Sequence, residues 1–278
     1  MKLVVLSDNR QVDESLESEH GLCIYLETDK YKCLLDTGAS NQFIRNAEKL
    51  NVNLKDVDYV FISHGHSDHT GGLQPFLEIN SKAQIIISRQ ALSYRFFSSR
   101  NGIKEIGTDI DIEGLENRFL FVENEMLIEN EIHVFSAKMH DFPSPKANKT
   151  LMRKHEDKLI SDDFQHEIIV TFGIEKMVVY SGCAHCGLLN ILDSVKQTLH
   201  KPISVLIGGF HLLDGSKGQY ETESDITTIA ESMHSLYPET AFITGHCTGN
   251  NVYGILKKKL KDNLTRFYTG YTISFIEN

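Results

Sequence analysis

Short apolar runs rich in β-branched and aromatic residues alternate along this chain with stretches in which apolar residues recur every three or four positions. The first pattern predicts β-strands and the second predicts amphipathic helices. Strands are expected at 22–27, 32–35, 59–63, 84–88, 119–122, 132–135, 167–172, 176–181, 203–207, 240–244 and 272–276. Helices are expected at 41–50, 72–79, 89–98, 187–199, 224–236 and 251–260.

The predicted strands and helices occur in both halves of the chain, and no linker rich in Pro, Gly or Ser separates them. This organisation predicts an α/β (α+β) protein with one domain over residues 1–278, built from two packed sheets with helices outside. Residues 99–163 follow a less regular pattern and contain Pro143 and Pro145. We interpret this segment as a candidate cover for a site.

Charge and apolar content narrow the expected partners. The chain has 28 Lys and Arg against 38 Asp and Glu, a net charge of −10. This balance argues against general binding to nucleic acid or to anionic membranes, since both favour a basic surface. No apolar run approaches the roughly 18 residues of a membrane-spanning helix, and the N-terminal run is too short for an export signal. We therefore expect a cytoplasmic protein with a small-molecule substrate, whose oligomeric state the sequence leaves open.

The strongest chemical signal is the sequence His-Gly-His-Ser-Asp-His at residues 64–69, directly after a predicted strand. Three imidazoles and a carboxylate would be costly to bury in a core, because each needs a polar partner. A metal site accounts for all four side chains. Imidazole and carboxylate ligands suit zinc first, with iron or manganese as alternatives, so we expect one or two divalent transition ions.

Three more histidines follow predicted strands later in the chain. His185 comes after the strand at 176–181, His211 after 203–207 and His246 after 240–244. Loops at strand ends commonly carry functional side chains. Together with the first motif, these positions favour metal ligation by His185 and His246. His211 could be a ligand, a substrate contact or a proton donor to a leaving group.

The motif at 64–69, with Leu-Leu-Asp-Thr-Gly at 34–38 upstream, resembles the metallo-β-lactamase-fold hydrolase superfamily. The segments Ser-Gly-Cys-Ala-His-Cys-Gly at 181–187, Gly-Gly-Phe-His-Leu at 208–212 and Thr-Gly-His-Cys-Thr-Gly at 244–249 are similar to its dihydropterin-ribofuranosylaminobenzene-phosphate synthase-like subfamily. The resemblance spans nearly the whole chain. It implies an αββα sandwich of two mixed sheets with outer helices, and a metal-dependent hydrolase activity.

The resemblance also implies roles for single residues. One metal site would be formed by His64, His66 and His185, and a second by Asp68, His69 and His246. Cys183 stands where much of the superfamily has an aspartate that bridges two metals. Its thiolate could ligate a metal, or its thiol could be a neutral buried group. Asp68 would also accept a proton, His211 would be catalytic or substrate-binding, and Asp36 would orient a ligand histidine.

Several functions remain open at this stage. The first is hydrolysis of an ester, lactone, amide or phosphoester by metal-activated water. The subfamily name implies a transferase that joins a pterin diphosphate to an aminobenzene ribose phosphate. A non-catalytic metal-binding protein is a third candidate. A fourth is a thiol redox protein using Cys183-x-x-Cys186, since this pair lies after a predicted strand and before a predicted helix. A zinc knuckle would need a second such pair, and the remaining three cysteines are isolated in the sequence. An aspartic protease would need a second Asp-Thr-Gly besides that at 36–38, and none occurs.

Basic residues suggest the charge of the substrate. Arg95 and Lys146, with Arg89, Arg100 and Lys149, could form a locally positive wall that attracts an anion despite the net negative charge. We therefore expect a small anionic substrate, phosphorylated and bound near His211.

Overall fold

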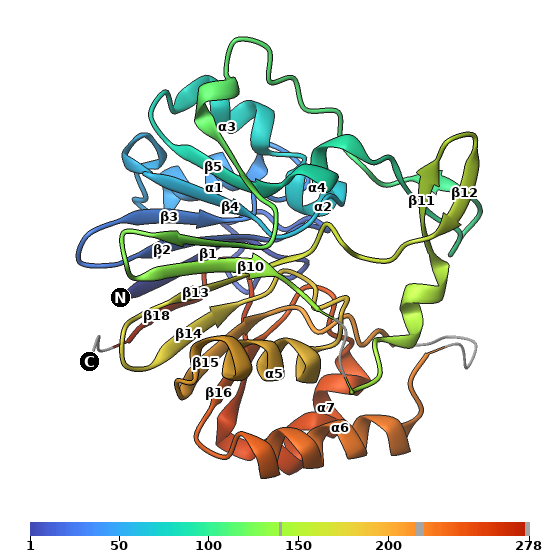
Figure 1. Cartoon of the computed structure of the whole chain (residues 1–278). Coiled ribbons are helices and arrows are strands. Elements are labelled where there is room, and N and C mark those ends of the chain that lie inside the picture. Colours follow the sequence, from blue (N-terminus) through green and yellow to red (C-terminus); the bar gives the residue numbers. More distant parts are fainter. Residues whose placement is uncertain (139–140, 215–219, 276–278) are drawn as a thin grey trace.

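The computed structural model describes residues 1–138, 141–214 and 220–275 and shows two large mixed sheets packed face to face (Figure 1). The predicted strand at 272–276 therefore ends outside the described residues. The first sheet has the order β18 (Thr272–Ser274), β1 (Lys2–Ser7), β2 (Cys23–Glu27), β3 (Lys32–Leu35), β4 (Tyr59–Ile62), β5 (Gln84–Ser88) and β8 (Phe119–Val122). Strands β3, β4, β5 and β8 are parallel, and the others are antiparallel to their neighbours.

The second sheet has the order β17 (Leu264–Arg266), β16 (Ala241–Thr244), β15 (Ile203–Gly208), β14 (Met177–Tyr180), β13 (Ile168–Phe172), β10 (Ile132–Ser136) and β9 (Glu125–Ile128). Strands β14 to β17 are parallel, whereas β13, β10 and β9 pair antiparallel. Parallel strands point their carboxyl ends toward the same edge of a sheet, so the loops that follow β14, β15 and β16 gather there.

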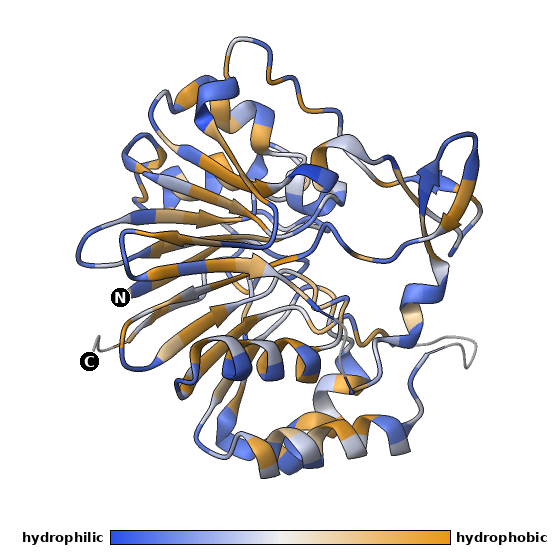
Figure 2. Cartoon of the chain, viewed as in Figure 1, coloured by the Kyte–Doolittle hydropathy of each residue, from blue (hydrophilic) through white to orange (hydrophobic). Residues whose placement is uncertain are grey.

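Helices cover the outer face of each sheet, which confirms the predicted αββα arrangement (Figure 1). On the first sheet, α1 (Gln42–Lys49), α3 (Leu73–Ile79) and α4 (Arg89–Ser93) bury Phe43, Phe76 and Ala91. On the second sheet, α5 (Leu188–Leu199), α6 (Glu223–Leu236) and α7 (Asn250–Leu260) bury their apolar faces in a separate core. Figure 2 shows the resulting contrast between apolar strands and helices of mixed polarity. In the part of the chain that the structure describes, no helix is both long and apolar enough to cross a membrane.

The prediction of a helix over 89–98 is wrong for the second half of this segment. Helix α4 ends at Ser93, and β6 (Phe96–Ser98) follows. Strand β6 pairs with β11 (Leu151–His155), which forms a hairpin with β12 (Lys158–Ser161); β7 (Lys104–Glu105) completes this small sheet. The partner strand lies more than fifty positions away, so the local apolar spacing could not reveal it.

The core between the two sheets is expected to be sensitive to truncation of Phe61. Its ring on β4 meets the ring of Phe172 on β13 edge to face, with centroids 5.7 Å apart, and both side chains are buried. Phe61→Ala should lower the free energy of unfolding by about 3–5 kcal/mol, because a large cavity remains. Urea denaturation would measure this loss. Leu127→Ala, at a half-exposed position on β9, serves as the control and should cost less than about 1 kcal/mol.

Candidate metal centre

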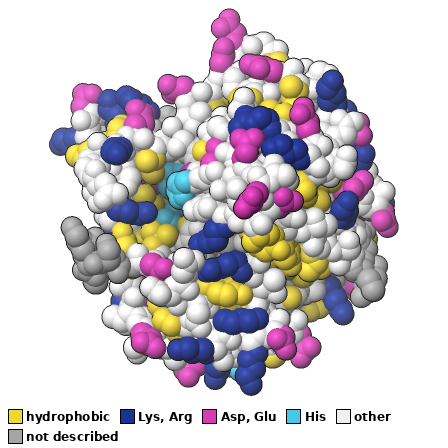
Figure 3. Space-filling view, turned by 180° about the vertical axis from the view of Figure 1, so that it is seen from behind, with side chains coloured by type: hydrophobic (Ala, Val, Ile, Leu, Met, Phe, Trp, Pro, Cys, Tyr) yellow, Lys and Arg dark blue, Asp and Glu magenta, His cyan; other side chains and the backbone are white. Residues whose placement is uncertain are grey.

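Loops at the ends of strands from both sheets bring the sequence-predicted residues together. The motif at 64–69 connects β4 with α2 (Ser67–Thr70) in the first sheet. In the second sheet, Cys183 and His185 follow β14, His211 follows β15, and His246 follows β16. Histidine side chains are visible in a hollow beside the lobe that carries the small sheet of β6, β7, β11 and β12, with hydrophobic side chains next to them (Figure 3).

Two pairs of histidine rings face each other through their Nε2 atoms. These atoms are 3.3 Å apart between His64 and His185, and 3.1 Å apart between His69 and His246. Cys183 belongs to both groups: its Sγ is 3.2 Å from Nε2 of His69, and candidate ligand atoms lie within 4.8 Å of one another in each trio. All five side chains are buried.

The opposite nitrogen of each of these four rings faces an oxygen atom. Nδ1 of His69 lies 2.5 Å from Asp36 Oδ2, and Nδ1 of His246 lies 2.9 Å from Asn9 Oδ1. Nδ1 of His185 lies 3.2 Å from Asn148 Oδ1, and Nδ1 of His64 lies 2.8 Å from the Ser63 hydroxyl. Acceptors on this side place the N–H at Nδ1 and leave Nε2 with a lone pair. Lone pairs that face each other this closely repel unless a proton or a metal ion lies between them.

The protonation tendencies of these groups agree with a cation site. Burial, with neighbouring histidines, lowers the pKa of His64 and of His185 well below the usual range, so both rings are in the neutral form that binds metals. Burial lowers the pKa of His246, but its hydrogen bond with Asp68 and the nearby Cys247, Asp68 and Asp8 side chains together outweigh burial and raise the pKa to about 9. The position thus favours a positive charge, which a proton or a metal ion can supply.

Asp68 is the accessible carboxylate of the cluster. Its Oδ2 lies 3.3 Å from Nε2 of His246, 3.8 Å from Nε2 of His69 and 3.3 Å from Nε2 of His20. Burial raises the pKa of Asp68, but His69 and His246 outweigh it and hold the pKa well below its usual range. The side chain remains 20% exposed, whereas His69 and His246 are fully covered, so Asp68 can meet a substrate.

Among the described residues, His66 and His211 each carry a buried ring nitrogen without a hydrogen-bond partner. Nε2 of His66 is 3.9 Å from Asp162 Oδ2, and its ring centroid is 5.0 Å from that of His185. The ring centroid of His211 lies 4.3 Å from that of His185, and neither nitrogen of His211 has a hydrogen-bond partner in the part of the chain that the structure describes. Uncompensated buried imidazoles are costly, so these orphaned atoms fit a group that the protein alone does not provide.

Asp36 lies beneath the cluster and contacts one of its histidines, as expected from the sequence. Its carboxylate accepts hydrogen bonds from the Ser63 backbone and hydroxyl, from the Tyr180 hydroxyl and from His69 Nδ1. Its φ of 58° places it in the left-handed region. This strained backbone is held by the hydrogen bonds that fix the carboxylate.

Several residues around the centre were not predicted from the sequence. Nδ1 of His166 accepts a hydrogen bond from the backbone of Gly65, and its Nε2 is 3.1 Å from Asp162 Oδ2. The buried Glu167 carboxylate accepts hydrogen bonds from the backbone N–H groups of His185 and Cys186, which fixes that loop. The polar run Asp-Asp-Phe-Gln-His-Glu at 162–167, just before an apolar strand, was the signal that could have identified them.

The structure corrects the view that Cys247 is isolated. Its Sγ lies 3.2 Å from that of Cys183, although 64 positions separate the two residues. Cys186, which the sequence pairs with Cys183 in a Cys-x-x-Cys motif, donates a hydrogen bond from its backbone N–H to the Glu167 carboxylate. Burial raises the pKa of the Cys183 thiol well above its usual value.

The two basic residues proposed for the substrate are each engaged by a carboxylate. Arg95 forms a two-pronged contact with Glu105, and more than half of its side chain is exposed. The Lys146 ammonium lies 2.5 Å from Asp225 Oδ2, and its backbone N–H donates to Glu221. These contacts leave little free positive charge at either position.

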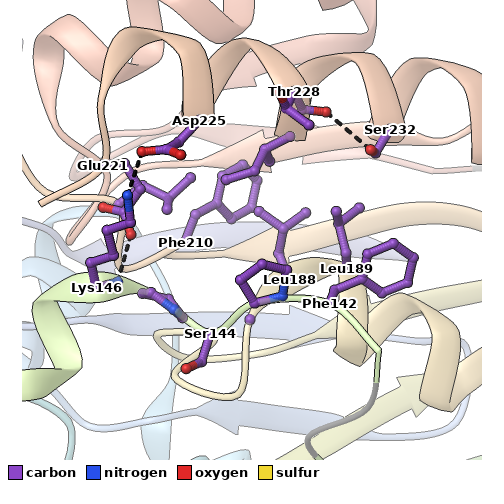
Figure 4. Close-up of a pocket in the computed structure, with 15 residues that line it drawn as sticks. Phe142, Ser144, Lys146, Leu188, Leu189, Phe210, Glu221, Asp225, Thr228 and Ser232 are labelled. Atoms are coloured by element: carbon purple, nitrogen blue, oxygen red, sulfur yellow. Dashed lines mark hydrogen bonds and ion pairs between the residues drawn. The ribbon is translucent and has the colours of Figure 1, made fainter.

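An apolar cavity of about 210 Å³ lies between the loop at 142–145, the start of α5 and helix α6 (Figure 4). Phe210 and Leu212, which flank His211, line it together with Leu188 and Leu189, which follow the His185 loop. The Asn190 amide exchanges hydrogen bonds with the backbone of Phe142 and thereby clamps the 142–145 loop to α5. Lys146, Asp225 and Glu221 lie at one end (Figure 4).

The fold and the site define the class of this protein as an enzyme of the metallo-β-lactamase fold. The family model described as the metallo-beta-lactamase superfamily matches residues 18–145, which contain the motif at 64–69. The crystal structure of Tm1679, a metal-dependent hydrolase of the beta-lactamase superfamily, covers 99% of both chains with a TM-score of 0.78 and 26% identity.

A curated relative makes the resemblance more particular. The 7,8-dihydropterin-6-methyl-4-(beta-D-ribofuranosyl)-aminobenzene-5'-phosphate synthase of Methanocaldococcus jannaschii is 27% identical over 274 residues, which is 93% of this chain and 90% of that protein. The resemblance inferred from the sequence motifs is thereby confirmed. The structure of Zn²⁺-bound PqqB from Methylobacterium extorquens shares the fold alone, with 12% identity and a TM-score of 0.56 over 99% of this chain and 100% of that chain.

Proposed function

We propose that this chain is a metal-dependent hydrolase that binds one or two divalent transition ions, zinc first and iron or manganese as alternatives. The observation that carries the proposal is the two Nε2–Nε2 contacts, 3.3 Å between His64 and His185 and 3.1 Å between His69 and His246. Nδ1 of each of these four rings faces an oxygen atom. The proposed ligands are His64, His66, His185, Asp68, His69, His246 and Cys183. When bound, such ions act as Lewis acids and make water nucleophilic at neutral pH.

The chain's own residues would then hold the substrate and move protons. Asp68, partly exposed and ionised, accepts a proton from the attacking water. Asp36 fixes the ring of His69 so that its Nε2 faces the centre. His211, between two cavity-lining residues and beside His185, contacts the substrate near the reacting bond.

The apolar cavity supports a substrate that carries a ring. A cavity of about 150 Å³ accommodates benzene, so this cavity of about 210 Å³ would hold a group of one or two rings. Because Arg95 and Lys146 are paired with carboxylates, an anionic group on the substrate would bind mainly to the ions at the centre.

A transferase is the second candidate, and the full-length similarity to the synthase of M. jannaschii favours it. The same centre could bind a diphosphate leaving group, while the cavity holds a ring system. The two functions share the metal centre and differ in the attacking group, which is water in the hydrolase and the aminobenzene acceptor in the transferase.

Elemental analysis and a substrate panel test the proposal. The protein purified without chelator should contain about one to two equivalents of transition metal. Lactones, thioesters, phosphodiesters and pterin diphosphates should be compared, because turnover of one class identifies the chemistry. A metal content below about a tenth of an equivalent that added zinc, iron or manganese does not restore would contradict the metal centre. Turnover only when an aminobenzene acceptor accompanies a pterin diphosphate would replace the hydrolase with the transferase.

A further inference from the structure

We propose that Cys247 and His211, together with Cys183, form a sulfur-rich ligand set that gives this centre a preference for zinc or iron(II) over manganese. The inference rests on the metal centre of the proposed function and extends it to two residues outside the proposed ligands, with His211 as a ligand in place of the substrate contact proposed above. It concerns which ion the centre accepts, so it can fail while metal binding by the histidines stands.

The three side chains converge from three different loops. Cys183 follows β14, His211 follows β15 and Cys247 follows β16. One sulfur, one ring nitrogen and the second sulfur lie within 4.8 Å of one another, and the two sulfurs are 3.2 Å apart. Each residue is at least nine-tenths buried.

His211 provides an independent observation that a ligand is missing. Both of its ring nitrogens are buried, and neither makes a hydrogen bond with residues 1–138, 141–214 or 220–275. Its backbone φ of 48° lies in the left-handed region, which non-glycine residues seldom adopt. In this conformation its backbone N–H donates to Cys247 Sγ at 3.2 Å. A metal ion bound through one ring nitrogen would satisfy an imidazole that the described residues leave without a partner.

The surrounding backbone is shaped to let the sulfur approach. A Cβ atom at Gly209 would come within 2.3 Å of Cys247 Sγ, so only glycine fits there. The Thr248 hydroxyl accepts a hydrogen bond from the backbone of Phe210 and contacts the Thr244 hydroxyl at 2.7 Å, which ties the two loops together. The cluster is therefore held in place by its neighbours.

Ligand chemistry then predicts the selectivity. Thiolates and imidazoles favour zinc and iron(II), whereas manganese prefers carboxylates, carbonyls and water. Cys183 is shared with both histidine trios, so a thiolate there would connect the sulfur-rich set to the rest of the centre. Replacing sulfur by oxygen at Cys247 should therefore weaken zinc binding more than manganese binding.

Cobalt(II) is the probe, because thiolate ligands give it a near-ultraviolet charge-transfer band that histidine and carboxylate ligands do not. The cobalt-loaded wild type should show this band, and Cys247→Ser and Cys183→Ser should each reduce it. Cys186→Ser is the matched control: it is also buried in the Cys183 loop, but its sulfur is outside the cluster, and the band should not change. The preference for zinc over manganese in competition should fall about tenfold or more in Cys247→Ser.

An unchanged band and an unchanged zinc preference in Cys247→Ser would overturn the inference and leave the histidine centre intact. Failure of the wild type to bind cobalt at all would instead contradict the metal centre itself. X-ray absorption of the zinc-loaded wild type provides a measurement without any variant. A shell of two sulfur atoms at about 2.3 Å from zinc supports the ligand set, and one sulfur or none contradicts it.

Discussion

Asp68→Asn is expected to lower turnover by about 10²- to 10⁴-fold, the range associated with losing a positioned proton acceptor. The amide keeps the size of the carboxylate but cannot take up a proton, and it loses the charge that faces His246 and His69 at 3.3 Å and 3.8 Å. Because the side chain is partly exposed, the fold should tolerate the change. Rates measured on whichever substrate class the panel identifies would test this expectation.

Two variants make the result interpretable. Asp56→Asn removes a surface carboxylate that pairs with Lys32, and its activity should equal that of the wild type. His66→Ala removes a proposed ligand and should abolish turnover as well, with the circular dichroism spectrum unchanged. Retained activity in either Asp68→Asn or His66→Ala would exclude the proposed mechanism.

Asp36→Ala should cause the second large effect, on both stability and metal affinity. The substitution leaves the Ser63 and Tyr180 hydroxyls without their buried acceptor and releases Nδ1 of His69. Each buried group left unsatisfied costs about 1–3 kcal/mol, so we expect a loss of at least about 3 kcal/mol in the free energy of unfolding. Metal affinity should fall about 10- to 100-fold, since His69 is no longer oriented.

Tyr180→Phe is the matched comparison for this second prediction. It removes one hydrogen bond to Asp36 and leaves the contact between Asp36 and His69 in place. Its metal affinity should stay close to that of the wild type, while its stability falls by about 1 kcal/mol. Chemical denaturation and zinc titration with a competing chelator would measure both quantities. Equal zinc affinity in Asp36→Ala and the wild type would show that Asp36 does not orient a ligand.

The segment that contains β6 and β11 shows where the sequence pattern was insufficient. The apolar spacing at 89–98 predicted one helix, but pairing with β11 draws Phe96–Ser98 into a strand. Strand β1 was not predicted either, although it lies between β2 and β18 in the first sheet. The first error concerns a partner that lies far along the chain, which a local periodicity does not contain. Strand β1 pairs with the next strand, β2, and its apolar run Leu-Val-Val-Leu at 3–6 was a local signal that could have predicted it.

The sequence by itself determined the alternation of strands and helices, the cluster at 64–69 and the three distant histidines. These features depend on neighbouring residues, because apolar period and strand-end position are local properties. Only the tertiary structure decided that Cys183 meets Cys247 rather than Cys186, that Asp162 and His166 lie beside His66, and that carboxylates engage Arg95 and Lys146. Such contacts join loops from different strands, and their distances are set by how the two sheets pack, which no single stretch of sequence encodes.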